Sequence, residues 1–191
     1  MKTWLAVPAI ALGLVAATAA RAGEPTRATA ELQNAKGVRV GEATLVGKRN
    51  GVLIQIEIDN LEPGTYGLHI HEKGSCRGPA FKSAGEHFNP TGAKHGFKDL
   101  EGPHAGDLWN IEVPEHGRLS VKQYNARVTL KEGTDNSVLR EGGTSFIVHA
   151  NGDDYATEPA GNAGAGIACG VIKTMAPQQA QAVSDATPVI K

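Results

Sequence analysis

The histidines of this chain are spaced as metal ligands often are. His69 and His71 are separated by one residue in an apolar, strand-like segment, and side chains two residues apart on a strand point to the same face. Two imidazoles on one face can hold one metal ion, although this spacing alone also occurs by chance on protein surfaces. His149 ends a second apolar segment, residues 146–149, and can supply a third imidazole from a neighbouring strand.

A second group of potential ligands lies in or next to the polar segment 73–106, which is rich in Gly, Pro, Lys and His and has no hydrophobic period. The segment contains His87, His95 and His104, and Asp107 follows His104 at a compact spacing. A structureless segment of this length is unusual in a compact domain, and a bound metal would supply the missing ordering energy. Nitrogen and oxygen ligands suit a closed zinc site, whereas an all-imidazole set with an open position suits copper, and imidazole also suits zinc.

The segments around these residues predict an all-β fold. Short alternating or β-branched segments, many of them separated by glycine-containing turns, predict eight strands. They span residues 29–33, 38–46, 52–58, 65–71, 108–113, 119–130, 145–150 and 166–172. Eight short strands favour an eight-stranded sandwich or flattened barrel over an α/β architecture, with two long loops at 73–106 and 151–165.

The first 22 residues have the features of a signal peptide. A basic start is followed by an apolar stretch from Trp4 to Ala20 and a small-residue cleavage site before Gly23; cleavage after Ala19 is an alternative. An uncleaved membrane anchor is the other alternative, but an apolar stretch of this length containing Pro8 is marginal for a bilayer. We therefore expect an exported protein, periplasmic or secreted, with one domain at residues 23–175 and a flexible tail at 176–191.

The composition indicates a globular protein without a strongly charged character. Hydrophobic residues make up 40% of the chain and charged residues 20%, and the formal net charge is −1. Nothing in this balance indicates nucleic acid or an anionic membrane surface as a partner. Aromatic residues are only 5%, so Val, Ile, Leu and Ala must form most of the core.

Export changes the interpretation of the two cysteines, Cys76 and Cys169. An even number of cysteines outside the cytosol indicates a disulfide, and two buried thiols are the alternative. The bridge would close a loop of about 93 residues and stabilise the fold by roughly 4–5 kcal/mol on the chain-entropy model.

Taken in order along the chain, these motifs resemble those of the copper/zinc superoxide dismutase family. The resemblance extends from about residue 27 to residue 173. It is carried by Gly67-Leu-His-Ile-His-Glu72, Gly85-Glu-His-Phe-Asn-Pro90, Lys94-His-Gly96, Gly102-Pro-His-Ala-Gly-Asp-Leu108, Val148-His-Ala-Asn-Gly-Asp-Asp154, Gly161-Asn-Ala-Gly164 and Ile167-Ala-Cys-Gly-Val-Ile172. The fold that it implies is a Greek-key, immunoglobulin-like sandwich, in agreement with the all-β prediction.

The resemblance implies a role for each matching residue. The implied copper ligands are His69, His71, His87 and His149. The implied zinc ligands are His87, His95, His104 and Asp107, so that the ring of His87 would join one copper to one zinc. Asp153 matches a carboxylate that ties a copper ligand to a zinc ligand, and Cys76 and Cys169 match the family's disulfide. His116 has no counterpart, and we expect it in a solvated turn.

The reaction implied by the resemblance is disproportionation of superoxide. One superoxide anion is oxidised to oxygen and a second is reduced to hydrogen peroxide at copper, while zinc stays redox-silent. By family analogy His87 and His149 are the catalytic residues, and the His87 bridge leaves copper and takes up a proton on reduction.

Three other classes of protein are alternatives, and the sequence leaves a homodimer open. A copper- and zinc-buffering sandwich would bind metal without turnover. A zinc hydrolase needs an open zinc position, which four ligands would close. An adhesive sandwich would not need the histidines of the long loop.

One position departs from the family pattern. The family usually has an Arg three residues before the second cysteine, where it attracts and orients the anion beside copper, and here that residue is Gly166. The bases nearest in the sequence, all in the other long loop, are Lys73, Arg77, Lys94 and Lys98. Because all four copper ligands are present, we expect a working dismutase limited by weaker anion guidance, rather than a metal-binding relative with incidental activity.

Overall fold

The computed structural model describes residues 26–176. The predicted signal peptide at 1–22, and all but the first residue of the predicted tail at 176–191, lie outside this range. Within it, the structure contains the 3₁₀ helix η1 (Lys82–Ala84) and the strands β1 (Arg27–Asn34), β2 (Arg39–Lys48), β3 (Gly51–Ile58), β4 (Gly64–Tyr66), β5 (Leu68–His71), β6 (Ile111–Val113), β7 (Leu119–Asn125), β8 (Ser145–His149), β9 (Gly166–Val171) and β10 (Lys173–Thr174). In residues 26–176 no helix has the length and apolar character needed to cross a bilayer.

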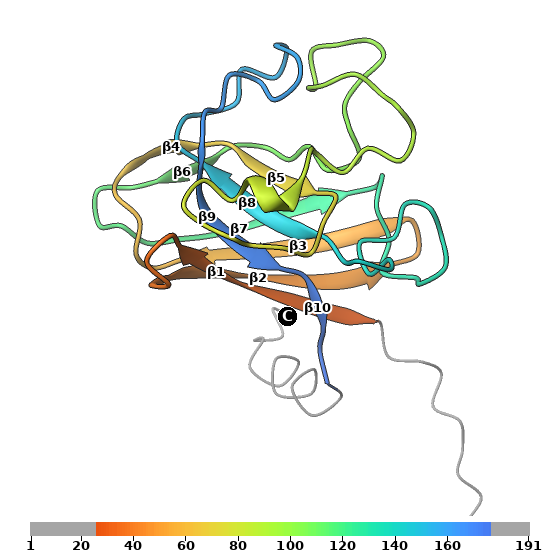
Figure 1. Cartoon of the computed structure of the whole chain (residues 1–191), viewed down its shortest axis with the longest axis horizontal. Helices are drawn as coiled ribbons and strands as arrows, with labels where there is room; N and C mark the ends of the chain where they lie inside the picture. The colour runs from red at the N-terminus through yellow and green to blue at the C-terminus, as the bar shows by residue number, and fades with distance from the viewer. Residues whose placement is uncertain (1–25, 177–191) are drawn as a thin grey trace, which may run out of the picture.

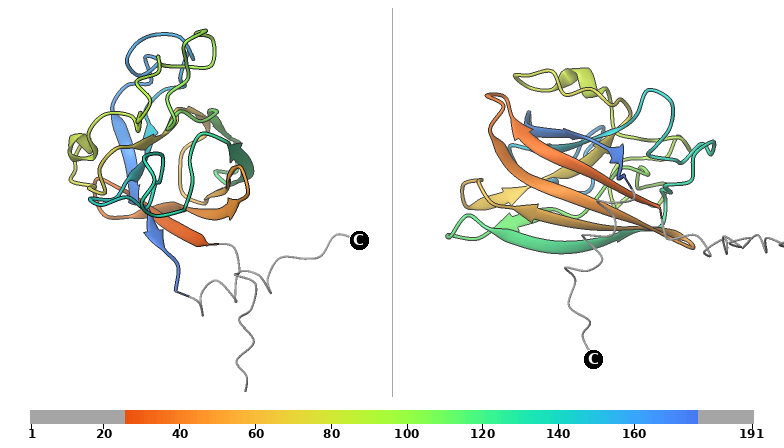
Figure 2. Two further views of the ribbon diagram at one scale, coloured as in Figure 1. Left: turned by 90° about the vertical axis from the view of Figure 1, so that its right-hand side faces the viewer. Right: turned by 90° about the horizontal axis from the view of Figure 1, so that it is seen from below.

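Eight of the strands form one curled antiparallel sheet (Figure 1). The strand order is β5-β8-β9-β1-β2-β3-β7, and β10 also pairs with β1, while β4 and β6 form a separate two-stranded ribbon. β9 returns from the far end of the chain to lie beside β1, with Gln33 opposite Cys169. Such a long return next to the first strand is typical of Greek-key folds. Figure 2 shows how the sheet curves around the core, and the all-β prediction is confirmed.

One of the eight predicted strands is divided in the structure, and another ends one residue early. The predicted strand 65–71 is split at Gly67 into β4 and β5, because the Gly67 N–H donates to the Asn151 carbonyl of the second long loop at 2.8 Å. The predicted strand 166–172 ends before Ile172, whose N–H donates to the Thr144 carbonyl at 3.0 Å, and β10 follows. The predictions for 108–113 and 119–130 were too long, since the strands there are β6 and β7.

The core is built from aliphatic side chains at alternate strand positions. On β3, Ile54, Ile56 and Ile58 are buried and the residues between them are half-buried or exposed, which is the pattern of a sheet with one face against the core. Phe88 and Phe146 are the largest of the fully buried side chains. Burying one Val, Leu or Ile side chain stabilises a fold by about 1.5–3 kcal/mol. The many buried aliphatic side chains can therefore stabilise the fold although aromatic residues are few.

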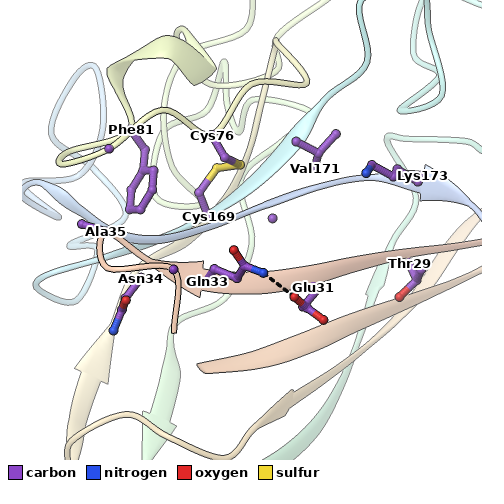
Figure 3. A pocket seen from close by; sticks show the side chains of 13 residues that line it. Thr29, Glu31, Gln33, Asn34, Ala35, Cys76, Phe81, Cys169, Val171 and Lys173 are labelled. Carbon is purple, nitrogen blue, oxygen red and sulfur yellow. Dashed lines mark hydrogen bonds between the residues drawn. A yellow bond between two sulfur atoms is a disulfide. The ribbon is translucent and has the colours of Figure 1, made fainter. Parts of the chain in front are cut away.

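The predicted disulfide between Cys76 and Cys169 is present, with Cα atoms 5.6 Å apart (Figure 3). It ties the loop after β5 to β9, and Phe81, Ala84 and Ile147 pack around it as a second buried cluster. A cavity of about 500 Å³ beside it is lined by β1 residues, the disulfide and Lys173 (Figure 3). None of the predicted metal ligands lines this cavity, so the disulfide anchors the base of the long loop away from the histidines.

Candidate metal centre

The long loop that carries the predicted ligands is attached along the edge of β5. The N–H of Phe88 donates to the Ile70 carbonyl and the N–H of Ile70 donates to the Gly106 carbonyl, both at 2.8 Å. A Cβ at Gly106 would lie 2.2 Å from the Ile70 oxygen, so only glycine allows this approach. Backbone hydrogen bonds to β5 therefore order the predicted long loop, in addition to the ordering energy that a bound metal would supply.

Two adjacent strands supply three of the four imidazoles of the first cluster. β5 carries His69 and His71 and pairs with β8, which ends at His149. His87 comes from the attached loop, opposite His71 in an isolated bridge. All four side chains are buried, and their potential ligand atoms lie within 4.8 Å of one another. The strand spacing and the loop attachment thus bring together the predicted first ligand set.

In His71 and His149 of this cluster, one ring nitrogen is hydrogen-bonded to a backbone carbonyl. Nδ1 of His71 is 2.8 Å from the Gly85 carbonyl oxygen, and Nδ1 of His149 is 2.9 Å from that of Gly164. Each Nδ1–H therefore donates to a carbonyl, which leaves Nε2 as the atom with a free lone pair. These two Nε2 atoms are 3.4 Å apart, with both lone pairs available to one ion.

The second cluster has the dimensions of a zinc coordination shell. It contains His87, His95, His104 and Asp107, all buried. Nδ1 of His104 is 3.4 Å from Nδ1 of His87 and 3.3 Å from Oδ1 of Asp107. Ligand atoms about 2.0–2.1 Å from a tetrahedral zinc ion are roughly 3.3 Å from one another. These contacts between ring nitrogens and a carboxylate are therefore spaced as the edges of a coordination tetrahedron.

Asp153 links the two clusters. Its Oδ2 lies 2.7 Å from Nε2 of His69 and its Oδ1 lies 3.1 Å from Nε2 of His95. The carboxylate accepts from both Nε2–H groups and so directs both Nδ1 atoms away from itself. Asn110 holds the backbone of Asp153 from two sides, accepting from its N–H and donating to its carbonyl, both at 2.9 Å.

Three buried imidazole nitrogens in these clusters lack a hydrogen-bond partner: Nδ1 of His69, Nε2 of His87 and Nδ1 of His95. A buried polar atom without a partner costs about 1–3 kcal/mol, so three in one region require an explanation. Nδ1 of His69 and Nε2 of His87 belong to residues of the first cluster, and Nδ1 of His95 to one of the second. Lone pairs directed at two metal ions would account for all three, so the residues present fit two metals.

Burial favours the neutral form of His69, His71 and His149 in the first cluster. It lowers the pKa of His69 to about 3, and neighbouring imidazoles contribute, while the hydrogen bond that His69 donates to Asp153 opposes the shift. Burial likewise lowers the pKa of His149 to about 4 and that of His71 well below its usual range. A metal ligand must be deprotonated, so these groups are ready to bind at neutral pH.

The second cluster concentrates negative charge. Burial would raise the pKa of Asp107, but its contacts with the rings of His104, His87 and His95 hold it well below its usual range. Burial would lower the pKa of His95, but its contacts with Asp107 and Asp153 raise it to about 10. A divalent cation at this cluster would take the place of the His95 proton that faces Asp107, while the Nε2–H of His95 would still donate to Asp153.

Gly166 lies directly beside the first cluster, opposite His149 in the β8–β9 pairing. A Cβ at this position would lie 2.9 Å from Cγ2 of Ile147, 3.1 Å from the Ala80 carbonyl oxygen and 3.5 Å from the Phe81 ring. Residues of the long loop and β8 thus occupy the space next to position 166. His116 is exposed in the turn between β6 and β7 and belongs to neither cluster.

Arg127 is a neighbour of the second cluster that the sequence did not reveal. It is half-buried, its Nη2 donates to the Asp107 carbonyl at 3.3 Å, and its guanidinium lies 5.3 Å from the centroid of the Phe97 ring. No spacing rule connects residue 127 with residue 107. Only the turn that follows β7 brings the guanidinium to the back of Asp107.

Comparison with known proteins shows that the chain is similar to copper/zinc superoxide dismutases. The family model of copper/zinc superoxide dismutase matches residues 39–172. "Superoxide dismutase [Cu-Zn] 2" of Aquifex aeolicus is 49% identical over 148 residues, which cover 77% of this chain and 86% of that protein. The dismutase of Caulobacter vibrioides is 42% identical, with 76% and 85% covered. The crystal structure of a SOD-like protein from Bacillus subtilis superposes with a TM-score of 0.72 at 42% identity, covering 75% of this chain and 96% of that one.

We predict that the metal-free protein loses stability as the pH falls from about 6.5 to 4.5. An unfolded histidine has a pKa of about 6.5, so the unfolded chain binds protons in this window that folded His69 and His149, with pKa values of about 3 and 4, do not. The free energy of unfolding should fall by about 2 kcal/mol per imidazole by pH 5. Thermal unfolding of the demetallated chain between pH 7.5 and 4.5 measures this loss.

The matched control is His116→Gln, which removes an exposed imidazole and should leave the pH profile unchanged. His149→Gln should flatten the profile. A profile that is level between pH 6.5 and 4.5 in the metal-free protein would contradict the prediction.

Proposed function

The chain belongs to the copper/zinc superoxide dismutase family, and from that premise we propose which of its residues bind copper and which bind zinc. The enzyme disproportionates superoxide to oxygen and hydrogen peroxide, with copper and zinc as cofactors. The proposed copper ligands are His69, His71, His87 and His149. The proposed zinc ligands are His87, His95, His104 and Asp107.

The observation that carries this assignment is the position of His87 in both clusters. Its Nδ1 lies 2.9 Å from Oδ1 of Asp107 on the zinc side, and its Nε2 is buried without a hydrogen-bond partner on the copper side. One ring with a nitrogen toward each set can serve both metals. The second cluster, with four ligands, is closed as a structural zinc site should be.

Bound copper would supply an electron-transfer centre that alternates between two valences, and zinc would stay redox-silent. Two superoxide anions and two protons give one oxygen and one hydrogen peroxide. We propose that, with copper bound, Nε2 of His87 would take up one of these protons and pass it to the peroxide product, while water would supply the other. His149, whose Nδ1–H donates to the Gly164 carbonyl, would bind copper through its Nε2.

We also propose that the protein is exported after removal of residues 1–22 and that residues 23–175 form its one domain. The Cys76–Cys169 disulfide supports export, because disulfides persist mainly in oxidising compartments. The "Extracellular superoxide dismutase [Cu-Zn]" of Haemonchus contortus, 36% identical over 132 residues, also supports it. In this proposal superoxide is the partner, and the mature chain binds neither nucleic acid nor membrane. A homodimer is compatible with the proposal.

The purified mature chain is expected to retain one copper and one zinc ion and to consume superoxide in a chelator-sensitive manner. Elemental analysis gives the metal content, and superoxide decay with and without a copper chelator gives the activity. His87→Ala should lower retention of both metals, because it removes a ligand from each set. A chain without copper, or one whose turnover matches free aqueous copper, would refute the proposed function.

Asp153→Asn is expected to weaken binding of both metals by about 10- to 100-fold, the usual effect of losing a group that orients metal ligands. The amide cannot accept from His69 and His95 together as the carboxylate does. The control is Asp154→Asn at the neighbouring position, because Asp154 is half-buried and its side chain contacts only residues 156, 157 and 162 of its own loop, not the histidine clusters. Competition with chelators of known affinity measures both; equal effects of the two substitutions would contradict the role of Asp153.

We propose that the missing guanidinium at position 166 limits the rate. Gly166→Arg should raise superoxide consumption about twofold to tenfold at low ionic strength and make it more sensitive to salt, because a cation beside copper attracts the anion. The added Cβ would lie 2.9 Å from Cγ2 of Ile147 and 3.1 Å from the Ala80 carbonyl oxygen, so these neighbours must shift, and we expect a loss of about 1–3 kcal/mol in stability.

Gly166→Ala separates the effect of the positive charge on the rate from the effect of the added Cβ on stability. It introduces the same Cβ contact without the charge, so it should lower the melting temperature without changing the salt dependence of the rate. Unchanged activity of Gly166→Arg at low ionic strength would count against the proposed rate limit.

A further inference from the structure

A cavity of about 300 Å³ opens beside the proposed shared ligand. His87 and His104 line it together with the charged residues Glu72, Glu86 and Arg140. The larger cavity beside the disulfide (Figure 3) reaches none of the predicted ligands. The smaller cavity therefore gives a small solute a place next to the His87 ring, and its charges decide which solutes favour it.

Arg140 is the one Lys or Arg among the residues that line this cavity, all of which lie in the described part of the chain. Its guanidinium carbon lies 5.8 Å from the centroid of the Phe88 ring, next to His87 in the sequence. A guanidinium at this distance is attracted to the aromatic face. The contact keeps the positive group near the His87 end of the cavity even though the side chain is exposed.

The backbone that carries Arg140 is firmly attached to the loop after β5. The N–H of Gly143 donates to the Arg140 carbonyl, closing a turn in which Gly142 and Gly143 both have positive φ. The N–H of Gly74 donates to the Gly142 carbonyl at 2.9 Å, and the Ser145 hydroxyl donates to the Lys73 carbonyl at 2.8 Å. The turn thus holds Arg140 at a fixed place relative to the cavity.

The other bases near the metal centre, Lys94 among them, do not line this cavity. Lys73 pairs with Glu72 at 3.3 Å, and Lys98 donates to the Asp154 carbonyl at 2.7 Å. Arg77 and Lys82 line a different cavity in the disulfide loop. Position 166 carries no charge, so Arg140 is the cation that the structure leaves facing the cavity beside His87.

We propose that Arg140 attracts superoxide to the metal centre through this cavity, in place of a guanidinium at position 166. This inference rests on the proposed function, because it takes His87 as the ligand shared by both metals. Glu86 lines the same cavity and opposes Arg140, since its carboxylate repels an anion. Electrostatic guidance of an anion is a rate effect that falls with ionic strength, so the two residues should have opposite effects on the rate at low salt.

The test uses the metal-loaded enzyme and the variants Arg140→Gln, Arg140→Lys, Glu86→Gln and Arg49→Gln. Arg49 is an exposed arginine in the turn between β2 and β3 and is the matched control. Two readouts are compared over a range of ionic strength: the second-order rate of superoxide decay, and the dissociation constant of azide from copper(II), followed by optical titration. Azide reports anion attraction without turnover.

We expect Arg140→Gln to lower the rate about threefold to tenfold at low salt, to weaken azide binding by a similar factor and to flatten the salt dependence of both. Arg140→Lys should retain most of the wild-type behaviour, Glu86→Gln should raise the rate and tighten azide binding, and Arg49→Gln should change neither.

Unchanged rate and azide affinity in Arg140→Gln, with active wild-type enzyme, would overturn the role of Arg140 and leave the proposed function standing. A loss that is the same at high and low salt and that lysine does not rescue would also overturn it, because it would indicate a structural role. A metal-loaded wild-type chain without turnover would overturn the proposed function, and the role of Arg140 with it.

Discussion

The ring of His87 is 5% exposed and faces potential metal ligands with both of its nitrogens. Because one rigid ring belongs to both clusters, their separation is fixed by the dimensions of imidazole rather than by the flexibility of a linker. Every other ligand must then be held in register with it. β5 and β8 do so on one side through paired strands, and the long loop does so on the other through its hydrogen bonds to Ile70.

Two buried carboxylates balance this concentration of imidazoles. Asp107 contacts His87, His95 and His104, and Asp153 spans His69 and His95. A buried carboxylate is unfavourable unless it is paired and hydrogen-bonded, and both meet that condition through contacts that also orient the rings. The same contacts therefore offset the free-energy cost of burying the two carboxylates and fix the orientation of the histidine rings. His95 touches both carboxylates, so a change at either one should be felt in both clusters.

The charged side chains outside the metal centre are subject to different physical requirements from those of the ligands. Ligand geometry requires burial and rigidity, whereas attraction of an anion acts over several ångströms through water and tolerates an exposed side chain. Position 166 is crowded by Ile147, Ala80 and Phe81, and the glycine there relieves that crowding. Arg140 sits on a separate turn attached to the loop after β5, where a positive group meets no such contact with the β8–β9 pairing.

Local patterning along the chain predicted the strand-rich fold and the candidate metal ligands, whereas their division into a copper set and a zinc set came from the resemblance to the family. Alternation of apolar side chains acts over a few residues, and a pair such as His69 and His71 needs only the strand period to share a face. The same local rules failed at Gly67, where a backbone bond to a distant loop divides a strand, and they placed the end of another strand one residue too far, at Ile172. They identified residues 73–106 as a long loop but not its attachment to the edge of β5, because that edge becomes available only in the folded sheet.

The sequence by itself determined which atoms could bind metal, since histidine and aspartate bring their donor atoms wherever they are placed. Only the tertiary structure decided which nitrogen of each ring is free, because the carbonyls of Gly85 and Gly164 and the carboxylate of Asp153 come from distant segments. It also decided that Arg127 stands behind Asp107 and that Arg140 lines the cavity beside His87. Neither arginine has a signature in spacing, because their positions depend on how turns pack after the strands have paired.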